Sequence, residues 1–446
     1  YYGAHWIYPS WTMFGLRFPI DTREHTASWY AATRRDQGGH PALQGDIEAD
    51  IAIVGGGFSG VNTALELSER GYEVVLLEAN RLSWGASGRN GGQIIGGLGH
   101  DAKKFQKVIG EAGVRAIYDM GVEGPEIIRE RVARYDIDCD IRWGYVDVAL
   151  KPRHMRWFEE TQRKEAAAGY PHKLELLDAQ AVRQYVGSDI YLGGMVNANG
   201  GGHLHPMNLC LGEAAAAQTL GARFFEQTRV TAIEQGRRIT LRTENGSVAA
   251  RQVVLCGNAY MGELVPQLAK RVLPASSCII ATEPLPGDLA KSVLPRDVAV
   301  CDPRTALDYF RLTSDHRLLF GGLSNYTGLV PTNYREVMQR KMLKVFPQLA
   351  GTKIEFAWDG QLGIGLNRMP QMGKLGDKLF YIQAYSGHGV APTHIMARVM
   401  AEAIAGDTRR MDILSSIRHH PFPGGRYLRR PGMAVGMLYF KALDLF

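Results

Sequence analysis

The sequence has few cysteines, no long apolar run and no cluster of basic residues. Its five cysteines are odd in number and lack C-x-x-C spacing, which predicts small buried thiols in a reduced compartment rather than disulfides. No uninterrupted apolar stretch approaches the ~18 residues of a membrane-spanning helix. The net charge is only +6, and the basic residues are interleaved with acids, which argues against a nucleic-acid-binding face.

The two ends of the chain lack the patterns of a secretory signal and of a membrane anchor. Residues 1–26 are aromatic, but Pro9, Arg17 and Pro19 interrupt them and no cleavage pattern follows, so an irregular arm and a cytoplasmic protein are expected. Residues 411–446 combine arginines with apolar residues. Glycine and proline interrupt that stretch, which favours docking on the body or on a partner subunit over a membrane surface. An oligomer is left open.

Glycine is abundant, and the chain is long. Glycine accounts for 52 of 446 residues, about 12%, against a usual ~7%, so tight turns and close backbone approaches are expected. At about 150 residues per domain, the length predicts two or three domains. A hydrophobic fraction of 45% supplies a full core and excludes a disordered chain.

The strongest local pattern is a glycine motif between a predicted strand and a predicted helix. Residues 50–54 form a short apolar run, and the apolar residues after Gly60 recur at helical spacing. Gly55, Gly57 and Gly60 match G-x-G-x-x-G in the context that this motif requires. Gly55 permits a tight turn, Gly57 lets the backbone approach a pyrophosphate, and Gly60 lets the helix pack on the strand. The helix N-terminus favours the negative charge of that pyrophosphate.

An acidic residue follows at the distance that dinucleotide binding requires. A second apolar run at 74–77 ends in Glu78, which lies 18 residues after Gly60 and is placed to accept hydrogen bonds from ribose hydroxyls. The strand–helix–strand order implies a parallel sheet. The sequence therefore predicts a bound dinucleotide, although this unit alone does not separate FAD from NAD.

A second glycine-rich segment, residues 85–93, follows directly. It holds four glycines together with a serine, an arginine and an asparagine, and such a run of backbone N–H donors suits a pyrophosphate or the edge of a flavin. A surface loop is the alternative.

Further elements are predicted on both sides of a central insertion. Helices are expected over 101–135, 153–168, 209–220 and 396–405, and strands over 145–150, 223–225, 230–233, 239–242, 253–257, 318–320 and 379–382. Dinucleotide-type elements at both ends of the chain indicate one discontinuous domain with a second domain inserted in it.

These motifs resemble the FAD-dependent amine and amino-acid oxidases, the superfamily of D-amino-acid oxidase, glycine oxidase and monomeric sarcosine oxidase. The chain is most similar to the gamma-glutamylputrescine oxidase family within it. The resemblance runs from about residue 25 to the C-terminus. Besides the motif around residues 55–78, six segments carry it: 25–32, 86–93, 202–209, 256–260, 385–390 and 420–426.

The resemblance implies an α/β fold with two domains. One is a discontinuous Rossmann-like FAD-binding domain, and the other is a smaller α+β substrate-binding domain with a mostly antiparallel sheet. The expected ranges are 27–104, 198–272 and 356–410 for the first and 105–197 and 273–355 for the second, with an arm at 1–26 and a tail at 411–446.

The resemblance also implies which residues touch FAD. They are Gly55, Gly57, Phe58, Ser59, Gly60, Glu78, Ala79, Gly85, Ala86, Ser87, Gly88, Arg89, Asn90, Gly91, Gly92, Gln93, Val230, Gly257, Gly387, His388, Gly389 and Val390. Some members attach flavin covalently through a cysteine late in the chain. No cysteine follows Cys301 here, so non-covalent FAD is predicted.

Three residues are candidates for catalysis or substrate binding, each with a structural alternative. His388 either tunes the flavin or hydrogen-bonds to the backbone. Arg311 and Arg368 either clamp a substrate carboxylate or pair with a surface acid. His203 and His205 offer only two ligands with no acid or cysteine nearby, so no metal is predicted.

The implied chemistry is oxidative deamination of gamma-glutamylputrescine, or a related gamma-glutamylated polyamine, in polyamine catabolism. A hydride leaves the C–H beside the neutral amine nitrogen for the flavin, and the products are an aldehyde, ammonia and hydrogen peroxide. The expected partners are a small-molecule amine and molecular oxygen. The alternative is an oxidase or dehydrogenase of a secondary or cyclic amino acid such as sarcosine or pipecolate, which a two-arginine clamp would favour.

Overall fold

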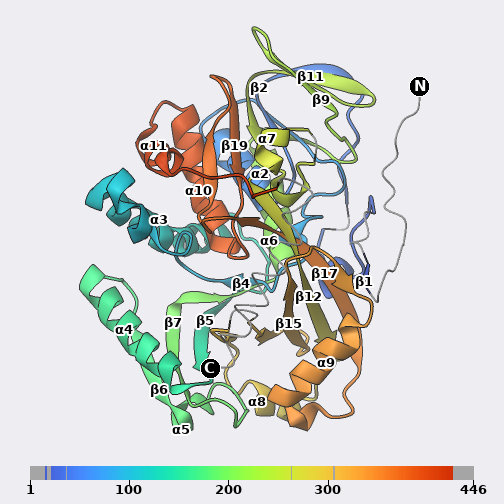
Figure 1. Cartoon of the computed structure of the whole chain (residues 1–446). Helices are drawn as coiled ribbons and strands as arrows, with labels where there is room; N and C mark the ends of the chain where they lie inside the picture. The colour runs from blue at the N-terminus through green and yellow to red at the C-terminus, as the bar shows by residue number, and fades with distance from the viewer. Residues whose placement is uncertain (1–15, 18–21, 37, 263, 305–306, 425–446) are drawn as a thin grey trace.

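The computed structural model describes residues 16–17, 22–36, 38–262, 264–304 and 307–424. Most of the expected arm at 1–26 and the tail from residue 425, with Arg426, Arg429 and Arg430, lie outside the described residues. The remainder folds around two large sheets, one in the upper and one in the lower half of Figure 1.

The upper sheet has eight strands and a parallel centre. The strand order is β18-β19-β11-β2-β3-β8, with β10 beside β11 and β9 beside β10. Strands β19, β11, β2, β3 and β8 run parallel to one another, whereas β18 and β10 pair antiparallel with β19 and β11. The bounds are β2 Gly45–Val54, β3 Val74–Leu77, β8 Arg223–Phe225, β9 Ala232–Glu234, β10 Ile239–Arg242, β11 Gly246–Leu255, β18 Gln371–Lys374 and β19 Leu379–Gln383.

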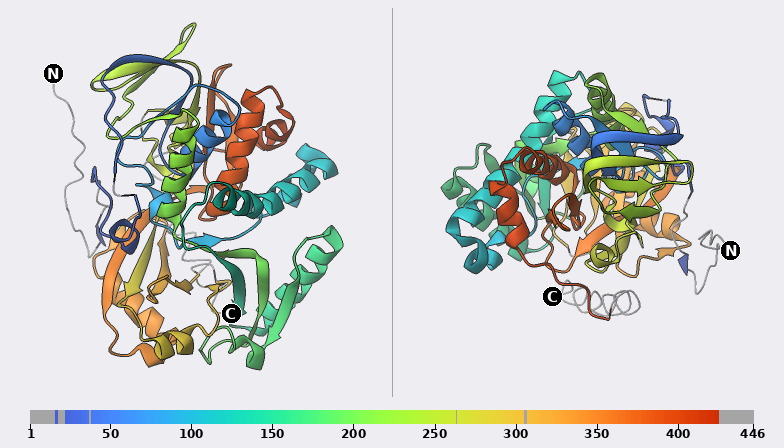
Figure 2. Two further views of the ribbon diagram at one scale, coloured as in Figure 1. Left: turned by 180° about the vertical axis from the view of Figure 1, so that it is seen from behind. Right: turned by 90° about the horizontal axis from the view of Figure 1, so that it is seen from above.

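Helices pack on this parallel sheet and supply most of the first core. Helix α2 is buried along its whole length, because α6 and α10 pack against it. Helix α10 also packs on α3, as the red-orange and teal helices of Figure 2 show. The bounds are α2 Phe58–Ser68, α3 Gln106–Arg134, α6 Pro206–Thr219, α10 Val390–Ile404 and α11 Arg409–Ser416. This helix layer fixes α2 against the strand that precedes it.

The lower sheet has nine strands and is mostly antiparallel. Its order is β17-β12-β15-β14-β13-β5-β7-β4, with β6 beside β7, and only β13 and β5 run parallel. The bounds are β4 Gln93–Ile94, β5 Arg142–Ala149, β6 Leu174–Asp178, β7 Gly193–His203, β12 Val272–Thr282, β13 Ala299–Cys301, β14 Tyr309–Leu312, β15 Leu318–Asn325 and β17 Ile354–Gly365. A mixed α/β fold with a parallel and a mostly antiparallel sheet confirms the expected fold class.

The two faces of the nine-stranded sheet differ in character. Because side chains alternate along a strand, Val146, Val300 and Phe310 point to one face, where they form a core with α8 (Gly287–Val293) and α9 (Tyr334–Val345). Their neighbours Tyr145 and Cys301 point to the other face, which lines a cavity. This alternation separates the packing face of the sheet from the face that a ligand can reach.

Several expected domain boundaries fall inside helices or strands, including 197/198 within β7, 272/273 within β12 and 410/411 within α11. Every strand of the eight-stranded sheet falls within the ranges expected for the FAD-binding domain. Strand β17, however, begins at Ile354 and pairs with β12 of the other sheet, so a boundary at residue 356 would cut through it. The division into domains itself stays a proposal.

Every predicted helix and strand is present, but several differ in their bounds: α10 begins at Val390 rather than at 396, and β11 begins at Gly246 rather than at 253. The helix expected over 101–135 is a short 3-10 turn, Ala102–Phe105, followed by α3, in which Gly110 departs from helical geometry. The strand expected at 230–233 begins only at Ala232. All five cysteines are free and buried, as predicted. None of the helices in the described ranges is long and apolar enough to cross a membrane.

Candidate active site

A large cavity opens between the two sheets and receives residues from both. Its volume is about 2460 Å³, more than the ~300–1,000 Å³ typical of a drug-sized ligand. We call two parts of its wall the glycine side, made by 55–59, 86–87 and 387–389, and the sheet side, made by Tyr145, Asp147, Cys301 and Tyr309. The cavity is thus large enough for a dinucleotide together with a substrate.

The first glycine motif shapes the glycine side through close backbone contacts. Gly55 has φ +110°, and a Cβ there would lie 2.9 Å from the Cys256 carbonyl. A Cβ on Gly60 would lie 1.9 Å from the carbonyl oxygen of Gly55. Only glycine therefore lets α2 start directly on top of β2, as the motif predicts.

Three glycines expected to touch the cofactor do not line the cavity. They are Gly60, Gly88 and Gly92. A Cβ on Gly88 would lie 2.1 Å from the Ser83 carbonyl oxygen, and one on Gly92 would lie 2.2 Å from the Leu204 carbonyl oxygen. The structure gives these glycines a packing role, and their contact with FAD stays a prediction. All the other residues expected to touch FAD line the cavity.

The N-terminus of α2 fits an anionic ligand. Gly57 occupies the N-cap position and provides no side chain to cap the helix. The N–H of Phe58 donates to Ser87 Oγ at 2.8 Å, which draws the second glycine segment onto the helix end. Phe58 and Ser59 of the first turn line the cavity, and the unpaired N–H groups of a helix N-terminus stabilise a phosphate.

Glu78 stands at the end of β3, where a ribose would be expected. Its Oε2 accepts the N–H of Gly56 at 2.6 Å and its Oε1 accepts the N–H of Asn80 at 2.8 Å. Burial raises the pKa of this carboxyl. Each oxygen keeps a second acceptor site, so the carboxylate fits a ribose hydroxyl pair while remaining tied to the backbone.

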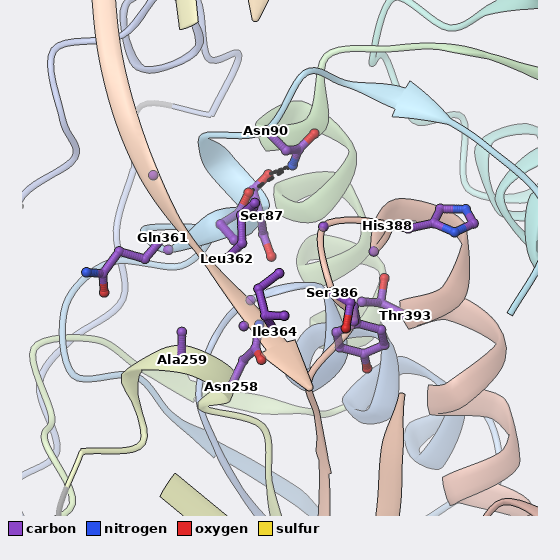
Figure 3. Close-up of a pocket in the computed structure, with 18 of the residues that line it drawn as sticks. Ser87, Asn90, Asn258, Ala259, Gln361, Leu362, Ile364, Ser386, His388 and Thr393 are labelled. Atoms are coloured by element: carbon purple, nitrogen blue, oxygen red, sulfur yellow. Dashed lines mark hydrogen bonds between the residues drawn. The ribbon is translucent and has the colours of Figure 1, made fainter. Parts of the chain in front are cut away.

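The second glycine segment and the late loop close the glycine side from opposite directions, as Figure 3 shows. Asn90 Nδ2 donates to the Ser87 carbonyl at 2.8 Å. On the other side, Ser59 Oγ and Tyr385 Oη lie 2.7 Å apart and share a hydrogen bond. The first bond lies within the second glycine segment, and the second connects α2 with a residue 326 positions away.

Arg89 and Gln93 line the cavity, but their side chains bind other parts of the chain. The Arg89 guanidinium lies 4.3 Å from the centre of the Trp84 ring, and its Nε donates to the Trp84 carbonyl at 2.8 Å. Gln93 Nε2 donates to the Val300 carbonyl at 3.0 Å. Both residues therefore hold the second glycine segment in place, and their contact with FAD stays a prediction.

His388 bonds to the backbone. Its Nε2 lies 2.9 Å from the Ile95 carbonyl oxygen, and since a carbonyl can only accept, this nitrogen carries the proton. Burial lowers the pKa of His388, so the ring is neutral at pH 7. In Figure 3 the ring points away from Leu362 and Ile364 of β17. This is the structural alternative described above, and a role in tuning the flavin stays a prediction.

Arg311, a predicted substrate clamp, does not line the cavity. Its Nε donates to the Gly91 carbonyl at 2.9 Å, its Nη1 to the Leu312 carbonyl at 2.9 Å, and its Nη2 to the Leu204 carbonyl at 2.9 Å. Nη2 also donates to Tyr30 Oη at 3.1 Å. A clamp needs both prongs of the guanidinium free, so Arg311 instead fastens the second glycine segment to the nine-stranded sheet.

Arg368 does line the cavity and keeps donors available. Its Nη2 donates to Tyr326 Oη at 3.0 Å, and the guanidinium lies 5.4 Å from the centre of that ring. Arg368 forms no ion pair with a carboxylate in the described ranges. It can therefore meet a carboxylate brought by a ligand.

The sheet side was not identified from the sequence. Tyr145 and Asp147 on β5 lie beside Cys301 on β13, and the Tyr145 hydroxyl donates to Asp147 Oδ1 at 3.3 Å. Burial raises the pKa of Asp147 to about 7. The sequence held one indication of this wall: Asp147 stands inside the apolar strand predicted at 145–150. Burial of a lone carboxylate is costly, so its presence there suggests a function.

His205 has a structural role. Its Nδ1 accepts the N–H of Asn208 at 3.1 Å and so caps α6. Across the part of the chain that the structure describes, no group of three or more His, Cys, Asp or Glu side chains is arranged to hold a metal.

Together, the parallel sheet, its glycine motif and terminal acid, and the second sheet across a shared cavity define a dinucleotide-dependent redox enzyme. The chain belongs to the family of FAD dependent oxidoreductases, which it matches over residues 50–403. FAD is therefore its cofactor, and the uncapped helix end and the glycine side fit this group.

The chain is similar to individual members of this family and to solved structures. The chain is 44% identical over 423 residues to gamma-glutamylputrescine oxidoreductase of Escherichia coli K12, covering 94% of this chain and 99% of that protein. It is 37% identical to the probable oxidoreductase OrdL of Haemophilus influenzae, covering 95% of this chain and 98% of that protein. The crystal structure of glycine oxidase from Bacillus cereus shares the fold, with a TM-score of 0.67 at 20% identity over 83% of this chain and 99% of that one.

Proposed function

We propose that the protein oxidises the primary amine of gamma-glutamylputrescine, or of a related gamma-glutamylated polyamine, in the breakdown of polyamines. In balanced form, the amine, one O2 and one water give the aldehyde, ammonia and hydrogen peroxide. The observation that carries the proposal is the 44% identity over 94% of the chain to an enzyme named for this substrate.

The cofactor is held without a covalent bond in this proposal. When bound, FAD accepts a hydride from the C–H beside the amine nitrogen. The expected contacts that line the cavity, from the glycine side to Glu78 and Val230, hold the cofactor through backbone donors and one carboxylate. By resemblance, the late loop at 387–390 would place backbone donors near the flavin ring, where they would stabilise developing negative charge as an oxyanion hole does.

The reacting amine is deprotonated in this scheme, because its lone pair must stabilise the forming iminium. In this proposal the protein favours the neutral form by lining the cavity with a neutral histidine, His388, and a positively charged arginine, Arg368. No residue is required as a base. The work of the protein is to orient the C–H and to exclude water.

A carboxylate on the substrate would meet Arg368. The gamma-glutamyl group carries such a carboxylate, and Arg368 is a cavity-lining arginine without an ion-pair partner in the described ranges. The alternative substrate class, a secondary or cyclic amino acid, was favoured by a clamp of two arginines. Arg311 lies outside the cavity with its donors satisfied, which removes half of that clamp and favours the glutamylated amine.

The proposal is tested with a panel of amines at equal concentration. Oxygen uptake, peroxide and aldehyde are measured with gamma-glutamylputrescine, putrescine, sarcosine and pipecolate. We expect turnover with the glutamylated amine and all three signals in equal amounts. Turnover with sarcosine or pipecolate alone would contradict the proposal.

A further inference from the structure

Asp147 lies on the sheet side of the cavity, two residues after Tyr145 on β5. It pairs across the sheet with Cys301 on β13, which in turn pairs with Tyr309 on β14. All four side chains lie on the face of the sheet that lines the cavity. Because Gly91 of the second glycine segment lies against the Tyr309 ring, this row leads from the expected flavin site to Asp147, two strands away.

Asp147 differs from Glu78 and Asp302, two other cavity carboxylates, in having no cation and no backbone N–H bonded to its side chain in the described ranges. Its contact in the described ranges is the Tyr145 hydroxyl at 3.3 Å. Glu78 binds two backbone N–H groups, and Asp302 forms an ion pair with Arg304. An unpaired carboxylate in a partly buried wall is costly, and a ligand cation would offset that cost.

We propose that Asp147 binds the non-reacting ammonium group of the substrate, which in gamma-glutamylputrescine is the α-ammonium of the glutamyl part. This inference rests on the proposed function and names a residue that selects the substrate for that reaction.

The chemistry separates this ammonium from the reacting amine. The reacting nitrogen must be neutral, and a carboxylate beside it would stabilise its protonated form. A carboxylate two strands away from Tyr309 avoids that conflict and suits a charged group at the far end of the molecule. Asp147 is therefore an anchor for the substrate and takes no part in hydride transfer.

If Asp147 binds the α-ammonium group, the enzyme should prefer gamma-glutamylputrescine over an analogue that lacks only this group. N-glutarylputrescine keeps the reacting amine, the amide and the carboxylate but lacks the α-ammonium. We expect wild-type kcat/KM to be about 10- to 100-fold higher for gamma-glutamylputrescine than for this analogue, as for a charge-assisted hydrogen bond.

The test measures kcat and KM for both amides with the wild-type protein and with Asp147→Asn. The substitution keeps the shape and the Tyr145 contact but removes the charge. We expect it to abolish most of the preference through KM, with kcat for the glutaryl amide unchanged. FAD content and thermal stability report whether the variant folds. The exposed Asp189, paired with Arg183 on the surface, supplies the control Asp189→Asn.

A second carboxylate that lines the cavity, Glu165, is the alternative binding group for the ammonium. Glu165 on α4 (Pro152–Ala168) also accepts a phenol hydrogen bond, from Tyr118 at 2.7 Å. An undiminished preference in Asp147→Asn, or a preference lost in Glu165→Gln instead, would overturn the inference while leaving the proposed function intact. A wild-type flavin that gamma-glutamylputrescine does not reduce would overturn the proposed function, and the inference with it.

Discussion

The glycine side and the sheet side of the cavity are built by different means. On the glycine side, neighbouring residues such as Gly55 and Gly57 act through backbone geometry, so a short stretch of sequence is enough to specify their part of the site. On the sheet side, Tyr145, Cys301 and Tyr309 come from three strands and act through side chains. A backbone-built site tolerates few substitutions, whereas a wall of side chains can change its substrate while the fold persists.

The largest effect is expected from adding one methyl group to the glycine side. In Gly60→Ala the new Cβ would lie 1.9 Å from a backbone oxygen that cannot move aside, so α2 must shift away from β2. We expect the purified protein to lose most of its FAD, measured as flavin absorbance per polypeptide. At Gly287 a Cβ would meet nothing within 4 Å, so Gly287→Ala should keep its FAD. Full occupancy in Gly60→Ala would contradict the packing role.

The next effect separates the two arginines. Arg311→Met removes donors from several buried carbonyls, and each unsatisfied buried group costs ~1–3 kcal/mol. We expect the free energy of unfolding in denaturant to fall by about 3 kcal/mol or more. The exposed Arg251, 3.3 Å from Asp50, gives the control Arg251→Met, which should change stability little. Normal stability with a raised KM in Arg311→Met would return Arg311 to the substrate site.

Arg368→Met should show the opposite pattern, with stability kept and substrate binding lost. Loss of a charge-assisted contact to the glutamyl carboxylate should raise KM about 10- to 100-fold. The gamma-aminobutyryl amide of putrescine lacks this carboxylate, and its KM should not respond to the substitution. An equal rise in KM for both amides would show that Arg368 shapes the cavity without binding the carboxylate.

The smallest effect is a dependence on pH. Burial raises the pKa of Asp147 to about 7, so the carboxylate loses its charge as the pH falls through 7. The preference for gamma-glutamylputrescine over N-glutarylputrescine should therefore fall by up to about tenfold per pH unit below 7 and level off above it. Both substrates share the reacting amine, so the ratio of their kcat/KM values cancels its titration. Asp147→Asn should give a flat ratio.

The side chains that neighbour Asp147 on the sheet side, Tyr145 and Cys301, do not titrate near pH 7. Burial, with the negative charge of Asp147, raises the pKa values of Tyr145 and Cys301 well above their usual ranges, so both stay neutral near pH 7. Further charged or titratable groups that line the cavity include Arg153, His154, Glu165, Asp302 and Arg304. A ratio in Asp147→Asn that still changed through pH 7 would assign the titration to this second set.

The sequence predicted the parallel sheet and the glycine side because each depends on adjacent residues. The strand–glycine–helix order and the spacing to Glu78 are local, and the chain folds as they indicate. Strands β12 and β17 were missed. Pro274 and two serines interrupt the apolar pattern of β12, and glycines interrupt that of β17, so both depend on pairing with each other across the sheet.

Arg311 and Asp147 show why the substrate site was harder to predict. Arg311 follows a tyrosine and a phenylalanine in the sequence, and nothing there reveals that carbonyls of Gly91 and Leu204 would take its donors. Asp147 stands out only once β5 and β13 are paired and its face of the sheet is known. Both roles are set by residues more than 100 positions away.

Anaerobic reduction of the flavin by gamma-glutamylputrescine tests the central claim most directly. The purified, FAD-containing protein is mixed with the amine without oxygen while the visible flavin band is followed. The account predicts that the band bleaches and returns, with peroxide, when air is admitted. A flavin band that stays unchanged with this amine but bleaches with sarcosine or pipecolate would contradict it.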